Sequence, residues 1–98
     1  MRISIIIPTF NNLNYLSLLI NSILKNSNFK HEIILHINDG SDGTLNFAKQ
    51  NNIKHTHSIN NIGLCKSVNM AVKLASTDLL LYTHDDMFFC KDWDIYIK

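Results

Sequence analysis

Two adjacent carboxylates, Asp85 and Asp86, directly follow an apolar run in this chain. The run, residues 79–83, is short and continuous, which predicts a strand buried on both faces of a parallel sheet. Ligands of open α/β sheets bind outside the carboxyl ends of the strands, where this acidic pair would lie. Carboxylate oxygens suit Mg²⁺ or Mn²⁺, ions that also hold substrate phosphates. A solvated turn with both side chains simply exposed is the alternative reading of these residues alone.

Two further polar loops follow predicted strands. Residues 8–11 read Pro-Thr-Phe-Asn, and residues 38–41 read Asn-Asp-Gly-Ser. Because the carboxyl ends of parallel strands share one edge of a sheet, both loops are expected to meet the acidic pair at one ligand. Thr9 can offer its backbone or hydroxyl to a nucleotide, and Asp39 can accept hydrogen bonds from a base or a sugar hydroxyl. An ordinary loop role for Thr9 and an Asx turn for Asp39 are the alternatives.

Spacing argues against several other kinds of site. The glycines form neither Gly-X-Gly-X-X-Gly nor a P-loop, so a metal rather than a glycine cradle is expected to hold phosphate. His55 and His57 alternate along one predicted strand, but two more zinc ligands at suitable spacing are not evident. Cys65 has no base placed beside it by sequence, so packing is expected. Core packing is also the expected role of three aromatic residues that could otherwise stack on a ligand: Phe88, Phe89 and Trp93.

Seven alternating elements would position these loops. Strands are expected at residues 2–7, 32–37, 53–57 and 79–83, and helices at residues 13–26, 44–50 and 64–75. This alternation predicts right-handed βαβ units and therefore an α/β fold, with three layers and a mostly parallel sheet. Pro8 is expected to end the first strand, and the third strand is expected at or near an edge. Asn11, Asn12 and Thr44 are candidate helix N-caps.

Helical spacing of apolar residues predicts the inward faces of two helices. In the first helix these residues are Leu13, Leu16, Ile20, Ile23 and Leu24. In the last helix they are Leu64, Val68, Ala71, Val72 and Ala75.

Length, charge and cysteine content narrow the class of protein. The 98 residues suffice for one small domain, and 9 Lys+Arg against 8 Asp+Glu give a net charge of +1, which predicts no nucleic-acid partner. Two cysteines without Cys-X-X-Cys spacing favour reduced thiols in a cytoplasmic protein. No apolar segment reaches the ~20 residues of a membrane span, and peripheral association with the inner face of a membrane is left open.

The last residues, 95–98, supply no obvious closing element, so the chain is interpreted as a truncated first half of a larger fold. Such an open sheet would leave an unpaired edge and exposed apolar surface, which favours self-association.

Four short motifs follow one another in an order that is itself informative. They are Ile-Pro-Thr-Phe-Asn at 7–11, Asn-Asp-Gly-Ser-Asp-Gly-Thr at 38–44, Asn-Ile-Gly at 61–63 with Asn69 in the next helix, and the apolar strand with its acidic end at 79–86. In this order they resemble the N-terminal, nucleotide-sugar-binding half of the family 2 glycosyltransferases, which have the GT-A fold. The resemblance covers nearly the whole chain.

The resemblance implies a role for each matching residue. Thr9 and Asp39 would contact the nucleoside, with Asp39 reaching the base, and Asp85 would face the ribose or the sugar. Asp86 would bind the cation that bridges the diphosphate, with His84 as a second metal ligand. The implied nucleotide-binding residues are Pro8, Thr9, Asn11, Asp39, Asn69 and Asp85.

Three positions depart from the family pattern. His84 stands where the first Asp of the Asp-X-Asp metal motif usually lies, and imidazole is a poorer ligand for Mg²⁺ than for Mn²⁺. Asn38 replaces the first Asp of the turn after the second strand, which is one residue shorter than the pattern. Ser76 replaces a frequent Gly.

The implied activity is metal-assisted transfer of a sugar, with inversion, from a nucleotide-diphospho-sugar to an acceptor hydroxyl. Mn²⁺ or Mg²⁺ would be the cofactor and a UDP-sugar the first choice of donor, with dTDP- and GDP-sugars as alternatives; the acceptor, whether glycan, lipid or protein, is unknown. The catalytic base would lie beyond this chain, which alone is expected to be inactive. Asp92 and Asp94 flank Trp93 in a stretch that is expected to be a surface connection.

Two alternatives use similar sheets. One is a non-catalytic nucleotide-binding or assembly domain. The other is a Mg²⁺-dependent phosphoryl-transfer domain, which would need a nucleophilic Asp at the end of the first strand, where residues 8–10 supply none.

Overall fold

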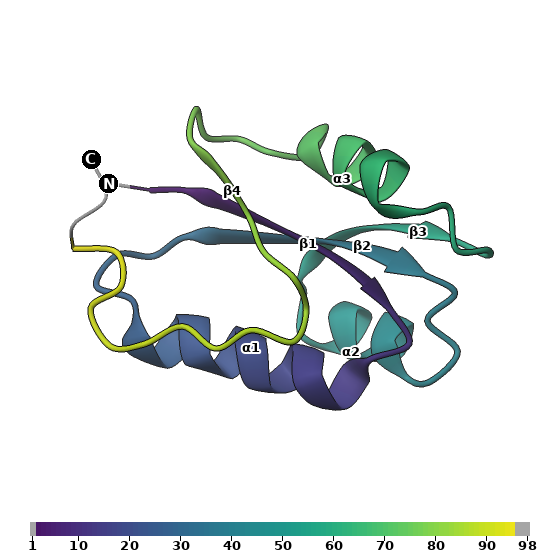
Figure 1. Ribbon diagram of the computed structural model, residues 1–98, viewed down its shortest axis with the longest axis horizontal. Coiled ribbons are helices and arrows are strands. Elements are labelled where there is room, and N and C mark those ends of the chain that lie inside the picture. The colour runs from purple at the N-terminus through teal and green to yellow at the C-terminus, as the bar shows by residue number, and fades with distance from the viewer. Residues whose placement is uncertain (1, 96–98) are drawn as a thin grey trace.

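A computed structural model describes residues 2–95, which form an α/β fold with a four-stranded sheet (Figure 1). The strand order is β3-β2-β1-β4, and all three pairings are parallel. The elements are β1 (Ser4–Phe10), α1 (Leu13–Asn26), β2 (Glu32–Asn38), α2 (Thr44–Gln50), β3 (Lys54–Ser58), α3 (Leu64–Val72) and β4 (Leu80–Tyr82). The predicted class of fold is therefore confirmed, as is the edge position of the third strand.

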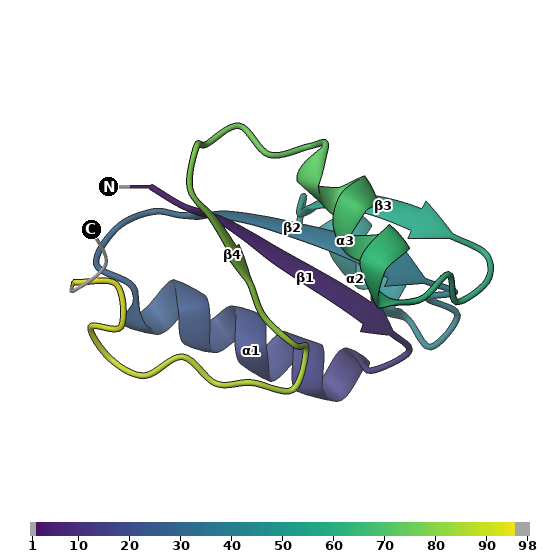
Figure 2. The same ribbon diagram turned by 45° about the horizontal axis from the view of Figure 1, so that its top comes forward.

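Helices cover both faces of the sheet, with α1 and α2 on one face and α3 on the other (Figure 2). The larger core lies between the sheet and α1, and its β1 members are Ile5 and Ile7. Ile6 points to the opposite face, where it packs with Ile34 and Ala71. Because the central strand β1 is buried on both faces, its sequence is a continuous isoleucine run rather than an alternating pattern.

Pro8 does not end β1, contrary to the prediction. The strand continues to Phe10, and Pro8 pairs in register with His36 of β2. The backbone N–H and C=O groups of even-numbered β1 residues point toward β4. Two hydrogen bonds show this: the Ser4 N–H donates to the Leu79 carbonyl, and the Thr83 N–H donates to the Ile6 carbonyl. The pairing of β1 with β4 stops at Ile6, so the missing N–H of Pro8 falls where no β4 partner needs it.

β4 is an edge strand and not the doubly buried strand that its apolar sequence predicts. It pairs with β1 over only three residues, and in the described part of the chain no strand lies on its other side. Leu80 and Tyr82 are consequently 44% and 40% exposed. The expected open edge with apolar surface is therefore present along β4.

The helices differ from the prediction at their margins. In α1 the buried stripe includes Leu19, while Leu24 is 69% exposed because it lies one residue past the inward-facing Ile23. α3 ends at Val72, and Cys65 on its first turn is exposed rather than packed. Within residues 2–95, no helix is both long enough and apolar enough to span a bilayer.

The segment after β4, residues 86–95, runs back along α1 (Figure 1). It is fastened by the Phe89 N–H, which donates to Ser22 Oγ at 2.9 Å, and by the Trp93 indole N–H, which donates to Ser27 Oγ at 2.8 Å. Phe89 and Trp93 pack against the larger core, as expected, whereas Phe88 is exposed. The sequence offered no placement for this segment, because its contacts are more than 60 residues away along the chain.

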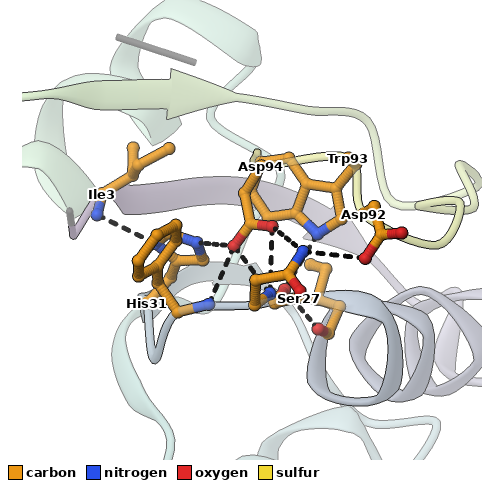
Figure 3. A network of polar contacts seen from close by, with 9 residues as sticks. Ile3, Ser27, His31, Asp92, Trp93 and Asp94 are labelled. Atoms are coloured by element: carbon orange, nitrogen blue, oxygen red, sulfur yellow. Dashed lines mark hydrogen bonds and ion pairs between the residues drawn. The ribbon is translucent and has the colours of Figure 1, made fainter. Parts of the chain in front are cut away.

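Asp94 is a buried anchor and not part of a surface connection, which corrects the prediction for this residue (Figure 3). Its carboxylate accepts the backbone N–H of Asn28 at 2.9 Å and that of Phe29 at 3.0 Å, and it contacts His31 Nε2 at 2.7 Å. Burial acts to raise the pKa of Asp94, but these hydrogen bonds outweigh it and hold the pKa well below the usual value. The ring of His31 must donate through Nε2, since its Nδ1 accepts the Ile3 N–H at 3.0 Å.

A second buried carboxylate, Glu32, joins the amino ends of three strands. These ends lie opposite the carboxyl ends of the strands, where the loop after β4, residues 83–86 (the acidic loop), is located. It accepts hydrogen bonds from Ser4 Oγ at 2.7 Å, Lys54 Nζ at 2.5 Å, and the backbone and hydroxyl of Ser76 at 2.9 and 2.7 Å. Burial acts to raise its pKa, but these hydrogen bonds dominate and lower the pKa of Glu32 from 4.5 to about 2. The charged form therefore stabilises the fold.

We expect Glu32→Gln to lower the free energy of unfolding at neutral pH by roughly 2 kcal/mol, because a buried charged acceptor is lost. Folding lowers the pKa of Glu32, so its contribution is complete above pH 4.5 and is lost as the pH falls toward about 2. In urea titrations across this range, the gap between the wild type and the variant should therefore close. Asp78→Asn, at an exposed carboxylate, is the control, and a gap that is independent of pH would contradict the prediction.

Candidate functional site

A cleft of about 290 Å³ opens at the carboxyl ends of β1 and β4. The chain winds from β1 through β2 to β3 in one direction and then crosses to the other side of β1 to form β4. A reversal of this kind separates the loops that follow the two adjacent strands, which is where open α/β sheets bind ligands. The lining residues are Pro8, Thr9, Phe10, Asn12, Asn38, Asn61, Gly63, Leu64, Ser67, Tyr82, His84 and Asp85.

The carboxylate of Asp85 is held in the cleft by two donors. Thr9 Oγ1 donates to its Oδ2 at 2.8 Å, and Asn12 Nδ2 donates to its Oδ1 at 3.1 Å. Thr9 is buried at the end of β1, and Asn12 lies just before α1. The predicted meeting of the β1 and β4 loops is therefore present, with Asp85 at the point of contact.

Asp39 makes the corresponding link between the loops after β1 and β2. Its carboxylate accepts Asn11 Nδ2 at 3.0 Å and the Ser41 backbone N–H at 3.1 Å, the latter being the Asx turn that was considered as its alternative role. His57 Nε2 lies 2.7 Å from the Asp39 carbonyl and donates to it. The hydrogen bond from Asn11, followed by that from Ser41, lowers the pKa of Asp39, so the side chain is an anionic acceptor at neutral pH.

Gly40 allows this turn to form. Its φ of +82° lies in the left-handed region, and a Cβ added there would approach Cγ2 of Ile37 to 2.7 Å. Its N–H donates to Asn11 Oδ1 at 3.0 Å, so the Asn11 amide holds both Asp39 and Gly40. Only glycine fits both the backbone conformation and the close approach.

Asp42 caps two helices, a role that the sequence assigned to other residues. Its Oδ2 accepts the Leu13 N–H at the start of α1 at 3.0 Å, and its Oδ1 accepts the Thr44 N–H at the start of α2 at 3.1 Å. Thr44 itself is buried and donates its hydroxyl to Asp42, so it is not the cap. Asn12 occupies the N-cap position of α1, but its side chain makes no capping hydrogen bond.

Asn38 forms the wall of the cleft and connects four segments. Its Nδ2 donates to the Thr9 carbonyl and to Ser67 Oγ, both at 3.1 Å. Its Oδ1 accepts the Ile62 N–H at 2.9 Å and the Ser58 hydroxyl at 3.2 Å. The buried side chain is thus satisfied from β1, β3, the loop before α3, and α3 itself.

The remaining residues of the acidic loop are more exposed. Tyr82 Oη lies 3.0 Å from His84 Nδ1 at the mouth of the cleft. Burial, followed by the charge of Asp85, raises the pKa of Tyr82 and keeps its hydroxyl protonated. Asp86 is exposed and does not line the cleft. Residues 2–95 contain no group of three or more His, Cys, Asp or Glu side chains arranged around a metal position.

The cleft brings together only some of the predicted site residues. Pro8, Thr9, His84 and Asp85 line it, whereas Asn11, Asp39 and Asp86 lie outside its lining on the loops that form its rim. Asn69 lies on an exposed part of α3, two residues beyond Ser67, so the structure does not bring it to the cleft with the others. The prediction omitted the other eight lining residues, among them Asn12, Asn38, Ser67 and Tyr82. The position of Asn12 directly after the first motif was the available signal.

The sequence matches the profile of glycosyl transferase family 2 over residues 4–95. The chain belongs to this family. No curated protein matches the sequence of this family 2 chain. The family assignment agrees with the resemblance drawn from the four motifs.

Solved structures of glycosyltransferases share the fold of this family 2 chain. S. aureus TarS in complex with UDP superposes with a TM-score of 0.81 at 28% identity, over 94% of this chain and 29% of that one. TarS in complex with UDP-GlcNAc gives a TM-score of 0.76 at 28% identity, over 93% and 28%. A mannosyltransferase from Pyrobaculum calidifontis, in complex with GDP-Man and Mn²⁺, gives 0.75 at 15% identity, over 90% and 28%. The chain thus spans less than a third of each of these proteins and shares their GT-A fold.

We expect Asp42→Ala to lower the free energy of unfolding by about 1–2 kcal/mol, because two helix starts lose their acceptor. Chemical denaturation followed by circular dichroism measures this loss. Asp78→Ala, which also removes an exposed carboxylate but one away from both helix starts, is the matched control and should leave stability unchanged. A variant at Asp42 as stable as the control would show that water caps both helices equally well.

Proposed function

We propose that this chain is the donor-binding part of an inverting glycosyltransferase and that its cleft takes a nucleotide-diphospho-sugar, with a UDP-sugar as the first choice. The observation that carries the proposal is the meeting of the β1, β2 and β4 loops through Thr9–Asp85 and Asn11–Asp39. The ionised side chain of Asp39 is an acceptor suited to a base N–H, and the side chain of Asp85 is an acceptor suited to a sugar or ribose hydroxyl. The UDP and UDP-GlcNAc complexes of TarS, at 28% identity, support a uridine donor.

The side chains of the acidic loop that could act as metal ligands fit a divalent cation that the substrate also helps to hold. Asp86 is exposed beside the cleft residues His84 and Asp85, while both oxygens of Asp85 already accept hydrogen bonds. Mg²⁺ and Mn²⁺ are often bound by one or two protein ligands together with phosphate oxygens and water, so a preformed cluster is not required. In the proposal Asp86 and His84 would hold the ion, which when bound would supply positive charge to offset that of the departing nucleoside diphosphate.

The chemistry at the acceptor is assigned to residues outside this chain. A general base must lie within about 2.6–3.2 Å of the acceptor hydroxyl. The two later carboxylates are poor candidates, because Asp94 is buried in its hydrogen bonds and Asp92 accepts Asn28 Nδ2 at 3.0 Å, beside that anchor. The 98-residue chain is therefore proposed to bind the donor without transferring sugar.

A non-catalytic nucleotide-binding domain is the competing proposal, and the His84 substitution in the metal motif favours keeping it. Turnover of a UDP-sugar by a longer chain that contains these residues separates the two. Released UDP that depends on an added acceptor supports the transferase, and binding without turnover supports the competitor.

The base contact is tested at Asp39. We expect Asp39→Ala to weaken UDP binding about tenfold or more, because an ionised hydrogen-bond acceptor is lost. Isothermal titration calorimetry measures the affinity, and thermal melting shows whether the fold is retained. Asp78→Ala removes an exposed carboxylate elsewhere and serves as the control. Unchanged UDP affinity in a folded Asp39→Ala protein would remove Asp39 from the site.

The metal is tested at Asp86. We expect Mn²⁺ to strengthen UDP binding more than Mg²⁺ does, because imidazole is a better ligand for Mn²⁺, and we expect Asp86→Asn to abolish the effect. The measurement is the UDP dissociation constant with Mn²⁺, with Mg²⁺ and with a chelator, for the wild type and the variant. Equal affinity of the wild type in all three conditions would show that the donor binds without metal.

A further inference from the structure

Asn12 occupies a helix N-cap position without using its side chain as a cap. Its carbonyl accepts the Leu16 N–H at 2.9 Å, which makes it the first acceptor of α1. An Asn at this position ordinarily accepts a backbone N–H of the first turn with its side-chain oxygen, and that hydrogen bond is not formed here. Its Nδ2 donates instead to Asp85 Oδ1 at 3.1 Å, across 73 residues of sequence.

A carboxylate from another loop supplies the missing cap. Asp42 Oδ2 accepts the Leu13 N–H at 3.0 Å, so the start of α1 does not depend on the side chain of Asn12. The position of Asn12 is therefore free to serve the cleft. In a capping Asn the side-chain amide stays at the first turn of the helix. The side-chain amide of Asn12 is instead directed at Asp85, which lines that cleft.

We propose that Asn12 is a positioning residue for donor binding: together with Thr9 it fixes the Asp85 carboxylate so that this group accepts a hydroxyl of the donor's ribose or sugar. The proposal rests on the proposed function. Each carboxylate oxygen of Asp85 accepts one hydrogen bond from the protein, Oδ2 from Thr9 and Oδ1 from Asn12. A rotation of the carboxylate would therefore disturb both hydrogen bonds. Each oxygen keeps a further lone pair for a ligand.

A hydroxyl is the group that fits this carboxylate. Asp85 is an acceptor whose two protein partners are both neutral donors, so its negative charge is not cancelled by a cation among its hydrogen-bond partners. A phosphate group would be repelled there, whereas a sugar or ribose hydroxyl donates to a carboxylate. Loss of one clamp would allow Asp85 to rotate and would weaken that contact without removing any atom that touches the ligand.

The test is Asn12→Ser in the intact 98-residue chain. Serine caps helices as well as asparagine does, but its hydroxyl is too short to span the distance to Asp85, so stability and binding should separate. We expect an unchanged or higher free energy of unfolding, together with about tenfold weaker binding of UDP-GlcNAc in calorimetry, equivalent to ~1.4 kcal/mol. Asn14→Ser makes the same chemical change at an exposed position two residues later and should alter neither. A parallel loss for UDP assigns the contact to the ribose, and a loss for UDP-GlcNAc alone assigns it to the sugar.

A double-mutant cycle with Asp85→Ala distinguishes positioning from a general structural effect. If Asn12 acts through Asp85, Asn12→Ser should weaken binding less than about twofold further once Asp85 is alanine. Independent, additive losses would overturn the proposal, as would a wild-type affinity in Asn12→Ser. A wild-type chain that binds neither UDP nor UDP-GlcNAc would overturn the proposed function, and with it this inference. Wild-type binding with an unaffected Asn12→Ser variant would overturn the role of Asn12 alone.

Discussion

The geometry of the cleft depends on the buried side chain of Asn38. A buried amide that lacks a partner costs roughly 1–3 kcal/mol, so its partners must reach it together. The Thr9 carbonyl, the Ile62 N–H and Ser67 belong to segments on different sides of the cleft, and all of them bond to this one amide. The family pattern has Asp at this position. Asp could not donate to the Thr9 carbonyl when ionised, so the substitution has a structural rationale in this chain.

The two faces of β2 have different roles: one stabilises the fold through apolar packing, and the other defines the register of the strand pairing. Toward α1 and α2 the strand presents Leu35 and Ile37, which pack in the larger core. On the α3 face His36 contacts Thr56 Oγ1 at 2.7 Å and Ser58 Oγ at 3.0 Å, which are polar partners on β3. Burial, followed by the charge of His57, lowers the pKa of His36, so the ring is a neutral link between the strands. A one-residue slip would turn these polar side chains to the apolar face. The polar contacts therefore select the register of the edge strand β3, which apolar packing alone would leave loosely defined.

Local pattern was sufficient for the elements and for the edge of the sheet that carries the site, because both follow from strand–helix alternation. It was insufficient wherever a residue's role is set by a distant partner. Asp94 was interpreted as part of a surface connection because it belongs to the Lys-Asp-Trp-Asp stretch at 91–94, yet the N–H groups that donate to its carboxylate lie in the connection between α1 and β2. Asn12 was correctly placed at the start of a helix, but its contact is with Asp85, a loop residue 73 positions later. Pro8 was predicted to end the first strand because it has no backbone N–H to donate. Only the register of the sheet showed that no neighbouring strand needs that N–H.

The acidic loop is held at both ends, which explains how exposed side chains can still form a defined site. On one side the Thr83 N–H donates to the Ile6 carbonyl at 3.1 Å, and Asp85 is clamped at the tip of β1. On the other side the Phe89 N–H is bound to Ser22 on α1, and Asp94 anchors the end of the 86–95 segment. Few residues separate these attachments, so Asp86 extends from a short span whose backbone has little freedom. A ligand that recruits Asp86 therefore has little chain entropy to remove, which is the condition under which a single exposed carboxylate contributes usefully to binding.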